Sequence, residues 1–377
     1  MIESGAMNRL PAILALADGR VLQGYSVGAS GSCVGELVFN TSSTGYQEML
    51  SDPSYARQLI TLTAPHVGNV GCNIDDMESG RAWAAGLVMR NISPLASNYR
   101  SQCSLPVWLN TQGVVAIAGI DTRQLVITLR DSGSIGACIT TNVHQPEIAV
   151  QKAQQFAGLQ NVDLAVEVSR QTIERWDGGR GIWGSGAKPL KYHVVVIDFG
   201  VKFNILRILQ DKGCQITLVP ATMDHQDVLA LNPQGVVLSN GPGDPAACDY
   251  AIRATQEFLQ RDIPLLGICL GFQILAIACG AVSLKMKFGH HGANHPVVEI
   301  NNSRVFITSQ NHGFAIDESS LPGCLIATHR SLFDHSLQGI KHISKPAIGF
   351  QGHPEASPGP KDSEGIFDDF IKFLDIR

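Results

Sequence analysis

The 377-residue sequence contains no cluster of basic side chains and no regularly spaced cysteines. It has 28 Lys and Arg against 33 Asp and Glu, a net charge of −5, which argues against nucleic acid as a partner. Its nine cysteines are scattered singly and form no Cys-x-x-Cys pair, which argues against a disulfide framework and a zinc site. Unpaired cysteines are typical of the reducing cytoplasm, where we expect the protein to be located.

Charge is also absent from the longest apolar run, residues 263–284. The run is long enough to cross a membrane, but three glycines, Pro264 and Gln273 interrupt it. A buried strand over 263–268 followed by a buried helix over 270–279 explains the pattern better. We therefore expect no membrane span here.

A shorter apolar stretch, residues 10–17, imitates an export signal because it follows Arg9 and contains Ala-Leu-Ala. Pro11 breaks this stretch, and Asp18-Gly19 predicts a hairpin turn between two strands. We favour the hairpin over the signal peptide.

Length and pattern predict two α/β domains. Apolar residues make up 44% of the chain, which excludes disorder and allows well-buried cores. Residues 1–168 contain short strands, with predicted helices over 122–130 and 146–156, and we expect a strand-rich α/β domain. Residues 169–191 contain five glycines and no sustained apolar period, which predicts a linker. Residues 192–377 alternate strands and helices, which predicts a doubly wound, mainly parallel sheet.

Cys269 lies where the predicted strand over 263–268 meets the helix that follows. Gly267 and Gly271 flank it at two residues on either side, the spacing of a nucleophile elbow. The start of the helix favours the thiolate, which is the form that attacks. The alternative is a buried cysteine that acts as a small hydrophobe, which we prefer for the other eight.

A thiolate nucleophile needs a base and a group that orients the base. Pro354 keeps His353 out of helix, and Glu355 projects to the same side of an extended segment, so these residues complete a candidate triad. A solvated turn is the alternative.

The backbone N–H of Leu270 and a second donor at Gly243 are candidates for an oxyanion hole. A phosphate cradle at Asn240–Asp244 is disfavoured, because the chain has neither a Gly-Lys-Ser/Thr motif nor Gly-x-Gly-x-x-Gly.

Three histidines, His290, His291 and His295, lie close together in the sequence and suggest a metal. Because no carboxylate or thiol keeps a regular ligand spacing with them, and because we interpret the region as a glycine-rich loop, we expect no metal site. His312 remains ambiguous.

Several motifs, in this order and spacing, resemble the class I (triad) glutamine amidotransferases: SNGPGDP (239–245), GICLGFQ (267–273), QNHGFA (310–315) and GHPE (352–355). Further motifs resemble the small, glutamine-hydrolysing subunit of carbamoyl phosphate synthetases: FNTSSTGYQE (39–48), DPSY (52–55), IDTR (120–123), KFGHHG (287–292) and QGHPEASPGP (351–360). The resemblance covers essentially the whole chain.

The resemblance implies that Cys269 is the nucleophile, His353 the base and Glu355 its orienter. It implies that L-glutamine is held by Ser54, Gly241, Gly243, Leu270, Gln273, Asn311, Gly313 and Phe314, with Ser54 reaching in from the first domain. Phe272 departs from the His that is common in the family, which puts the fine tuning of glutamine binding in question.

The resemblance also implies a division of labour. Ammonia would pass to a large synthetase subunit, which uses ATP, magnesium and bicarbonate to make carbamoyl phosphate for arginine and pyrimidine synthesis. This chain would bind neither cofactor nor metal and would work in a hetero-oligomer. The alternatives are a glutaminase for another synthase, such as anthranilate or GMP synthesis, an inactive docking subunit, and a thiol peptidase.

Overall fold

The computed structural model describes residues 10–184, 186 and 188–376. Contacts divide the chain into two compact units. The first comprises residues 1–50, 57–77 and 81–158, and the second comprises residues 51–56, 78–80 and 159–377. The short segments 51–56 and 78–80 therefore group with the second unit, although their neighbours along the chain belong to the first.

The first unit is built on a closed barrel with the strand order β1-β2-β8-β6-β4-β3-β9. Its strands, including the separate pair β5-β7, are β1 (Pro11–Leu16), β2 (Val21–Ser26), β3 (Ser32–Asn40), β4 (Gln58–Leu62), β5 (His66–Val67), β6 (Gly86–Val88), β7 (Asn91–Ile92), β8 (Val115–Ala118) and β9 (Ile135–Thr140). Its helices are α2 (Leu105–Thr111), α3 (Thr122–Ser132) and α4 (Pro146–Gln154), while α1 (Tyr46–Ser51) ends at the boundary with the second unit.

Side chains from the strands fill the inside of the barrel, because alternate residues of each strand point inward. Leu14, Leu37, Leu59, Val88 and Ile117 belong to this buried cluster, and none of them is exposed. The hairpin predicted at Asp18-Gly19 is present, because β1 and β2 pair antiparallel on either side of it. The sequence pattern did not predict α1 and α2.

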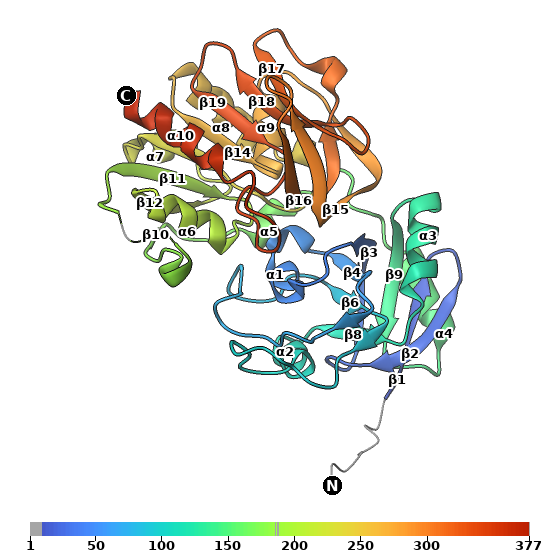
Figure 1. Cartoon of the computed structure of the whole chain (residues 1–377). Coiled ribbons are helices and arrows are strands. Elements are labelled where there is room, and N and C mark those ends of the chain that lie inside the picture. The colour runs from blue at the N-terminus through green and yellow to red at the C-terminus, as the bar shows by residue number, and fades with distance from the viewer. Residues whose placement is uncertain (1–9, 185, 187, 377) are drawn as a thin grey trace. The chain divides into compact units, whose positions relative to one another are not determined.

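The second unit contains a ten-stranded sheet in the order β10-β12-β11-β13-β14-β19-β18-β17-β15-β16. Its strands are β10 (Glu174–Trp176), β11 (Tyr192–Asp198), β12 (Cys214–Pro220), β13 (Gly235–Leu238), β14 (Leu265–Ile268), β15 (Ser283–Glu299), β16 (Val305–Ile316), β17 (Leu325–Ser331), β18 (Leu337–His342) and β19 (Ala347–Phe350). Its helices are α5 (Ala165–Val168), α6 (Phe203–Asp211), α7 (His225–Ala230), α8 (Asp249–Gln260), α9 (Leu270–Ala278) and α10 (Gly365–Ile376), all labelled in Figure 1.

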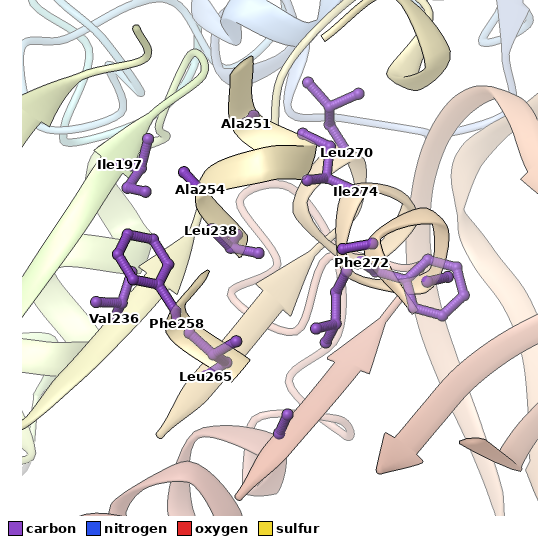
Figure 2. Close-up of a cluster of buried hydrophobic side chains, with 14 of the residues drawn as sticks. Ile197, Val236, Leu238, Ala251, Ala254, Phe258, Leu265, Leu270, Phe272 and Ile274 are labelled. Atoms are coloured by element: carbon purple, nitrogen blue, oxygen red, sulfur yellow. The ribbon is translucent and has the colours of Figure 1, made fainter. Parts of the chain in front are cut away.

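Strands β12, β11, β13, β14 and β19 run parallel, while β10, β18, β17, β15 and β16 extend the sheet in antiparallel pairs. Apolar side chains of α8 and α9 pack on one face of the parallel strands, where Phe258 and Ile274 meet Val236 and Leu265 (Figure 2). Residues of α6 and α10 pack with the alternate strand residues on the other face. Helices on both faces confirm the predicted doubly wound α/β fold.

One region differs from the expected glycine-rich loop. Residues 283–299 form strand β15, which pairs with β16. The register of this pair shifts between Lys285 and His290 and again between Gly292 and His295, and Gly289 has a φ of +67°. The glycines therefore accommodate irregularities within a strand. The loop interpretation was wrong.

Residues 169–191, which we predicted to be a linker, contribute strand β10 to one edge of the sheet and a short 3₁₀ turn at Gly181–Trp183. Of the helices in the described ranges, none combines the length and the apolar character that crossing a membrane requires.

Candidate active site

Cys269 occupies a sharp turn between β14 and α9. Its backbone has φ 52° and ψ −105°, a conformation that a residue with a side chain rarely adopts. Three backbone hydrogen bonds fix the turn: Cys269 N donates to Phe350 O at 2.9 Å, Gly271 N to Ser239 O at 3.0 Å, and Gln273 N to Cys269 O at 3.1 Å. Because the first two reach separate segments of the sheet, the fold holds Cys269 in this strained conformation.

The flanking glycines are required by close packing. A Cβ atom added at Gly271 would lie 2.0 Å from the carbonyl oxygen of Leu238, and one added at Gly267 would lie 2.5 Å from that of Gly271. Both distances are far inside van der Waals contact, so a side chain at either position would displace the turn. The geometry is that of the predicted nucleophile elbow.

His353 and Glu355 lie directly after β19 and are buried. Nδ1 of His353 donates to Oε1 of Glu355 at 2.6 Å. The backbone N–H of His353 donates to Ser309 O at 2.9 Å, which ties the segment to β16. The charge of the Cys269 sulfur is near enough to raise the pKa of His353, while Nε2 of His353 has no hydrogen-bond partner among the described residues. The structure thus brings the three predicted catalytic side chains together.

Lys202, which the sequence analysis did not identify, completes the charge network. Its ammonium group is 2% exposed and donates to Oε1 of Glu355 at 2.9 Å and to the carbonyl of Ala356. Lys202 directly precedes α6, and Asn204 in the first turn of that helix donates from Nδ2 to the carbonyl of Glu355. Glu355 is therefore held from both sides, by the imidazole and by the start of α6.

Burial alone would neutralise these groups, and their mutual charges prevent this. Burial raises the pKa of Glu355, but Lys202 and His353 outweigh it and lower that pKa to about 2. Burial likewise lowers the pKa of His353, but Glu355 and Cys269 outweigh it and raise that pKa to about 10. At neutral pH the site therefore holds an ionised carboxylate next to a protonated imidazole.

Glu78, in one of the two short segments that group with the second unit, reaches the same helix start. Its Oε2 accepts from the backbone N–H of Asn204 at 3.0 Å, and its own carbonyl accepts from the N–H of Phe203 at 2.9 Å. Burial raises the pKa of this carboxyl to about 7, although Lys202 and Arg207 oppose the shift. Glu78 thus fixes the residues that immediately follow Lys202.

Three of the residues expected to hold glutamine belong to a hydrogen-bond network that reaches the sulfur of Cys269. Its thiol donates to the carbonyl of Asn311 at 3.6 Å. Nε2 of Gln273 donates to Phe314 O at 2.8 Å and to Oε1 of Gln351 at 3.0 Å, and Gln351 in turn reaches the Cys269 sulfur at 3.8 Å. Asn311 and Gln351 therefore contact the sulfur, and Gln273 and Phe314 are connected to it through Gln351.

Ser54 belongs to a segment that groups with the second unit. Its Oγ accepts from Nδ2 of Asn240 at 2.9 Å. Asp52, in the same segment, accepts from Asn240 at 3.4 Å and from Nδ2 of Asn311 at 3.5 Å. This network joins Ser54 to the residues around Cys269.

The three glycines that are expected to hold glutamine, Gly241, Gly243 and Gly313, differ in their surroundings. A Cβ at Gly241 would meet Phe199 O at 2.2 Å and the side chain of Leu270 at 2.9 Å, so Gly241 lies against the first residue of α9. Gly243 has a φ of +93° and packs against Val162 and Leu164, and no described contact joins it to Cys269. Gly313 follows His312 on β16, where an added Cβ would lie 3.1 Å from Nζ of Lys285.

Phe272, which stands where the family commonly has histidine, is fully buried in the apolar cluster that packs α9 against the sheet (Figure 2). A Cβ at Gly349 would lie 3.0 Å from its ring. Phe272 therefore stabilises the helix that carries the elbow, and its ring does not line the surroundings of Cys269.

The histidine-rich segment forms a buried cluster on β15 and β16. The rings of His290 and His295 are 5.2 Å apart, and those of His290 and His312 are 5.0 Å apart. Nε2 of His290 contacts Asp334 at 2.9 Å, and both nitrogens of His312 are hydrogen-bonded to Phe314 O and Gln310. Burial and neighbouring histidines lower the pKa of His295 to about 3, so this ring is neutral at pH 7.

Four residues of the site were not identified from the sequence: Lys202, Gln351, Asp52 and Glu78. The sequence contains a recognisable signal for only some of them. Lys202 is a single charge between apolar residues in FGVKFNIL, and a lone charge on a buried helix start is a detectable signal. Gln351 directly precedes the GHPE motif. Asp52 and Glu78 carried no such signal, because their role depends on contacts with residues more than 120 positions away.

The second unit carries an elbow cysteine next to a histidine–carboxylate pair on a doubly wound sheet, and the family model of class-I glutamine amidotransferases matches its residues 195–373. The model of the carbamoyl-phosphate synthase small chain, CPSase domain, matches residues 14–139. The two matches account for both units.

Relatives match over nearly the full length. The carbamoyl phosphate synthase small chain of Pseudomonas aeruginosa is 56% identical, over 97% of this chain and 99% of the relative. That of Thioalkalivibrio sulfidiphilus is 56% identical, over 98% of each chain. The chain therefore belongs to the carbamoyl phosphate synthase small chain family.

Among solved structures, it is similar to a glutamine amidotransferase from Thermotoga maritima, with 21% identity and a TM-score of 0.36 over 49% of this chain and 83% of that chain.

Proposed function

We propose that this chain hydrolyses L-glutamine through Cys269, His353 and Glu355 and passes the ammonia to the large subunit of a carbamoyl phosphate synthase. The observation that carries the proposal is the strained elbow of Cys269 beside an imidazole that is protonated at neutral pH. A protonated imidazole stabilises a neighbouring thiolate and is ready to protonate a leaving amine.

The reaction begins with attack of the Cys269 sulfur on the side-chain carbonyl of glutamine. The backbone N–H of Leu270, at the start of α9, stabilises the oxyanion that forms. His353 gives its proton to the amide nitrogen, the carbon–nitrogen bond breaks, and ammonia leaves. The neutral His353 then takes a proton from water, which attacks the γ-glutamyl thioester and releases glutamate.

Glu355 keeps the imidazole in the orientation and tautomer that both proton transfers need. Lys202 is a positioning residue, because it contacts Glu355 and acts on the reacting atoms only through it. The carboxylate of Glu355 pairs with both buried cations, the imidazolium of His353 and the ammonium of Lys202. The substrate is bound by Asn311, Gln273 and Phe314, together with Ser54, Gly241, Gly243, Leu270 and Gly313.

A small chain acts with a large chain, and we assign the steps that use ATP, magnesium and bicarbonate to that partner in a hetero-oligomer. The carbamoyl phosphate would supply arginine and pyrimidine synthesis. The proposed location is the cytoplasm, which is supported by nine cysteines that are all free thiols.

The substitution Cys269→Ser tests this division of labour, because it changes one atom of the nucleophile and little volume. The reconstituted complex should lose carbamoyl phosphate synthesis from glutamine and keep synthesis from ammonium. Gel filtration should show that the variant still assembles. Loss of both activities in an assembled complex would refute the proposed separation of glutaminase and synthetase chemistry.

A further inference from the structure

Cys279, Cys324 and His342 form a cluster in the second unit that the proposed glutaminase does not use. Their two sulfur atoms and one ring nitrogen lie within 4.8 Å of one another. Cys279 is the C-cap residue of α9, Cys324 directly precedes β17, and His342 is the last residue of β18. All three side chains are partly exposed, so small solutes can reach them.

The surrounding backbone fixes the positions of the two cysteines. Cys279 N bonds to the carbonyls of Leu275 and Ala276, both at 3.2 Å, and the helix ends at Gly280, which has a φ of +109°. The carbonyl of Cys324 accepts from Ile343 N at 2.9 Å, which continues the β17–β18 pairing. The sulfurs can therefore approach each other by side-chain rotation, without unfolding of either element.

Two thiols and an imidazole suggest a metal site, but the hydrogen bonds of His342 argue against it. Its Nδ1 accepts from the backbone N–H groups of Ser344 at 3.2 Å and Lys345 at 3.0 Å. The ring proton consequently resides on Nε2, and neither nitrogen keeps a free lone pair for a metal. Two sulfur atoms remain as the reactive groups of the cluster.

We propose that Cys279 and Cys324 form a modification site at which a small-molecule disulfide, such as glutathione disulfide, produces an intramolecular disulfide. The Cys324 thiolate attacks one sulfur of the reagent, which releases one glutathione thiol and leaves a mixed disulfide. Cys279 then attacks the Cys324 sulfur and releases the second glutathione. Two electrons pass from the protein to the reagent, and the two thiol protons end on the two glutathione molecules.

The environment of Cys279 determines this order of attack. Burial and the neighbouring Cys324 raise the pKa of Cys279 to about 12, so it is a thiol at neutral pH. Its position at the end of α9, where the helix dipole is negative, also disfavours the thiolate. Cys279 is therefore the second cysteine to react.

Another cysteine pair provides a comparison within the same chain. Cys72 and Cys103 face each other in an antiparallel bridge in the first unit, but Cys72 has no exposed surface. A reagent in solution does not reach its sulfur while the unit is folded. The partly exposed Cys279–Cys324 pair should therefore react first.

The new bond would close the loop from residue 279 to residue 324. It would attach the end of α9 to the β17–β18 pair, and the first turn of the same helix follows Cys269. A loop of this length predicts stabilisation of the folded state by restricting the unfolded chain. We expect a rise in thermal midpoint of about 5 °C for the oxidised protein.

The test treats the full chain with glutathione disulfide in a Cys269→Ser background, so that the proposed nucleophile does not consume the reagent. Intact mass should fall by about 2 Da, and peptide mapping should find Cys279 linked to Cys324. Cys279→Ser should stop at a single glutathione adduct on Cys324. Cys324→Ser should remain unmodified at Cys279, and dithiothreitol should restore the original mass.

Three results would overturn the proposal. The first is a disulfide mapped to Cys72 and Cys103 with Cys279 and Cys324 still free. The second is an adduct that persists on Cys324 with Cys279 intact and unreacted. The third is uptake of one Zn²⁺ by the reduced protein that is abolished by His342→Ala, because this would show that the imidazole has a lone pair for a metal.

Discussion

The two units bury different kinds of side chain. In the described part of the first unit, Glu36 is the one buried carboxylate, and neither a histidine nor a lysine is buried. The second unit buries many ionisable groups: Asp52, Glu78, Asp198, Lys202, Asp211, Asp244, His290, His291, His295, His312, His353 and Glu355. Each buried charge costs free energy unless partners compensate it. The barrel therefore depends on apolar packing, while the second unit also depends on the partners that compensate its buried charges.

The largest effect expected is on catalysis by the charged core. His353→Asn removes the proton donor and should reduce the glutaminase rate by roughly 10³-fold or more. Glu355→Gln keeps the size of the orienting side chain and should cost less, roughly 10–10²-fold. Steady-state ammonia release measures both rates. The reverse order would mean that Glu355 does more than orient the imidazole.

Lys202→Met should destabilise the second unit by about 3–5 kcal/mol, because it removes one of the two cations that pair with the buried carboxylate of Glu355. The matched change in the barrel is Glu36→Gln, which keeps one of the two acceptor oxygens that Gln58 and Ser134 use and should cost about 1 kcal/mol. Hydrogen exchange of each unit measures the two effects separately. Equal losses would show that buried charge does not distinguish the units.

Gly271→Ala should destabilise the second unit by about 3 kcal/mol and disturb the elbow, because its Cβ would lie 2.0 Å from the carbonyl of Leu238. Gly365→Ala, where an added Cβ meets nothing within 4 Å, is the control and should be neutral or slightly stabilising. Chemical denaturation and glutaminase activity should both separate these variants. An active, stable Gly271→Ala would contradict the packing argument.

Acid should destabilise the second unit before the barrel. The pKa of His295 lies at about 3 when folded, below its ordinary 6.5, so the unfolded chain binds protons first. The stability that the neutral ring provides is complete above pH 6.5 and falls as the pH drops toward 3, by about 2 kcal/mol at pH 5. His295→Gln should remove this dependence, while His144→Gln, at an exposed site in the first unit, should not.

Glu78 should give a pH dependence of the opposite sign. Its pKa is raised from 4.5 to about 7, so its contribution is complete below pH 4.5 and is lost as the pH rises through 7. Glu78→Gln keeps an acceptor for the N–H of Asn204 and should be more stable than the natural protein by about 3 kcal/mol at pH 8. Urea unfolding at pH 5 and 8 tests this. A difference that does not change with pH would show that Glu78 does not titrate in the folded chain.

Local patterns predicted the parts of the site that depend on local geometry. The glycines around Cys269 specify the sharp turn, and the structure contains it. His353 and Glu355 do not form the expected extended pair, because Pro354 and Glu355 lie in a turn in which Ala356 N donates to His353 O at 3.0 Å. Lys202 and Glu78 were missed because their importance arises from contacts between distant segments. Strand β15 was missed for a different reason, since its glycines occupy irregularities that are stabilised by pairing with β16.

The grouping of residues 51–56 and 78–80 with the second unit also limits its modularity. A chain cut at residue 159 would retain the triad, Lys202 and the whole ten-stranded sheet, and yet it would lose Asp52, Ser54 and Glu78. Asn240, Asn311 and Asn204 would each lose a partner that they have in the full chain. To transfer this glutaminase to another synthase, evolution or engineering would therefore have to include residues 51–56 and 78–80, or replace their hydrogen bonds.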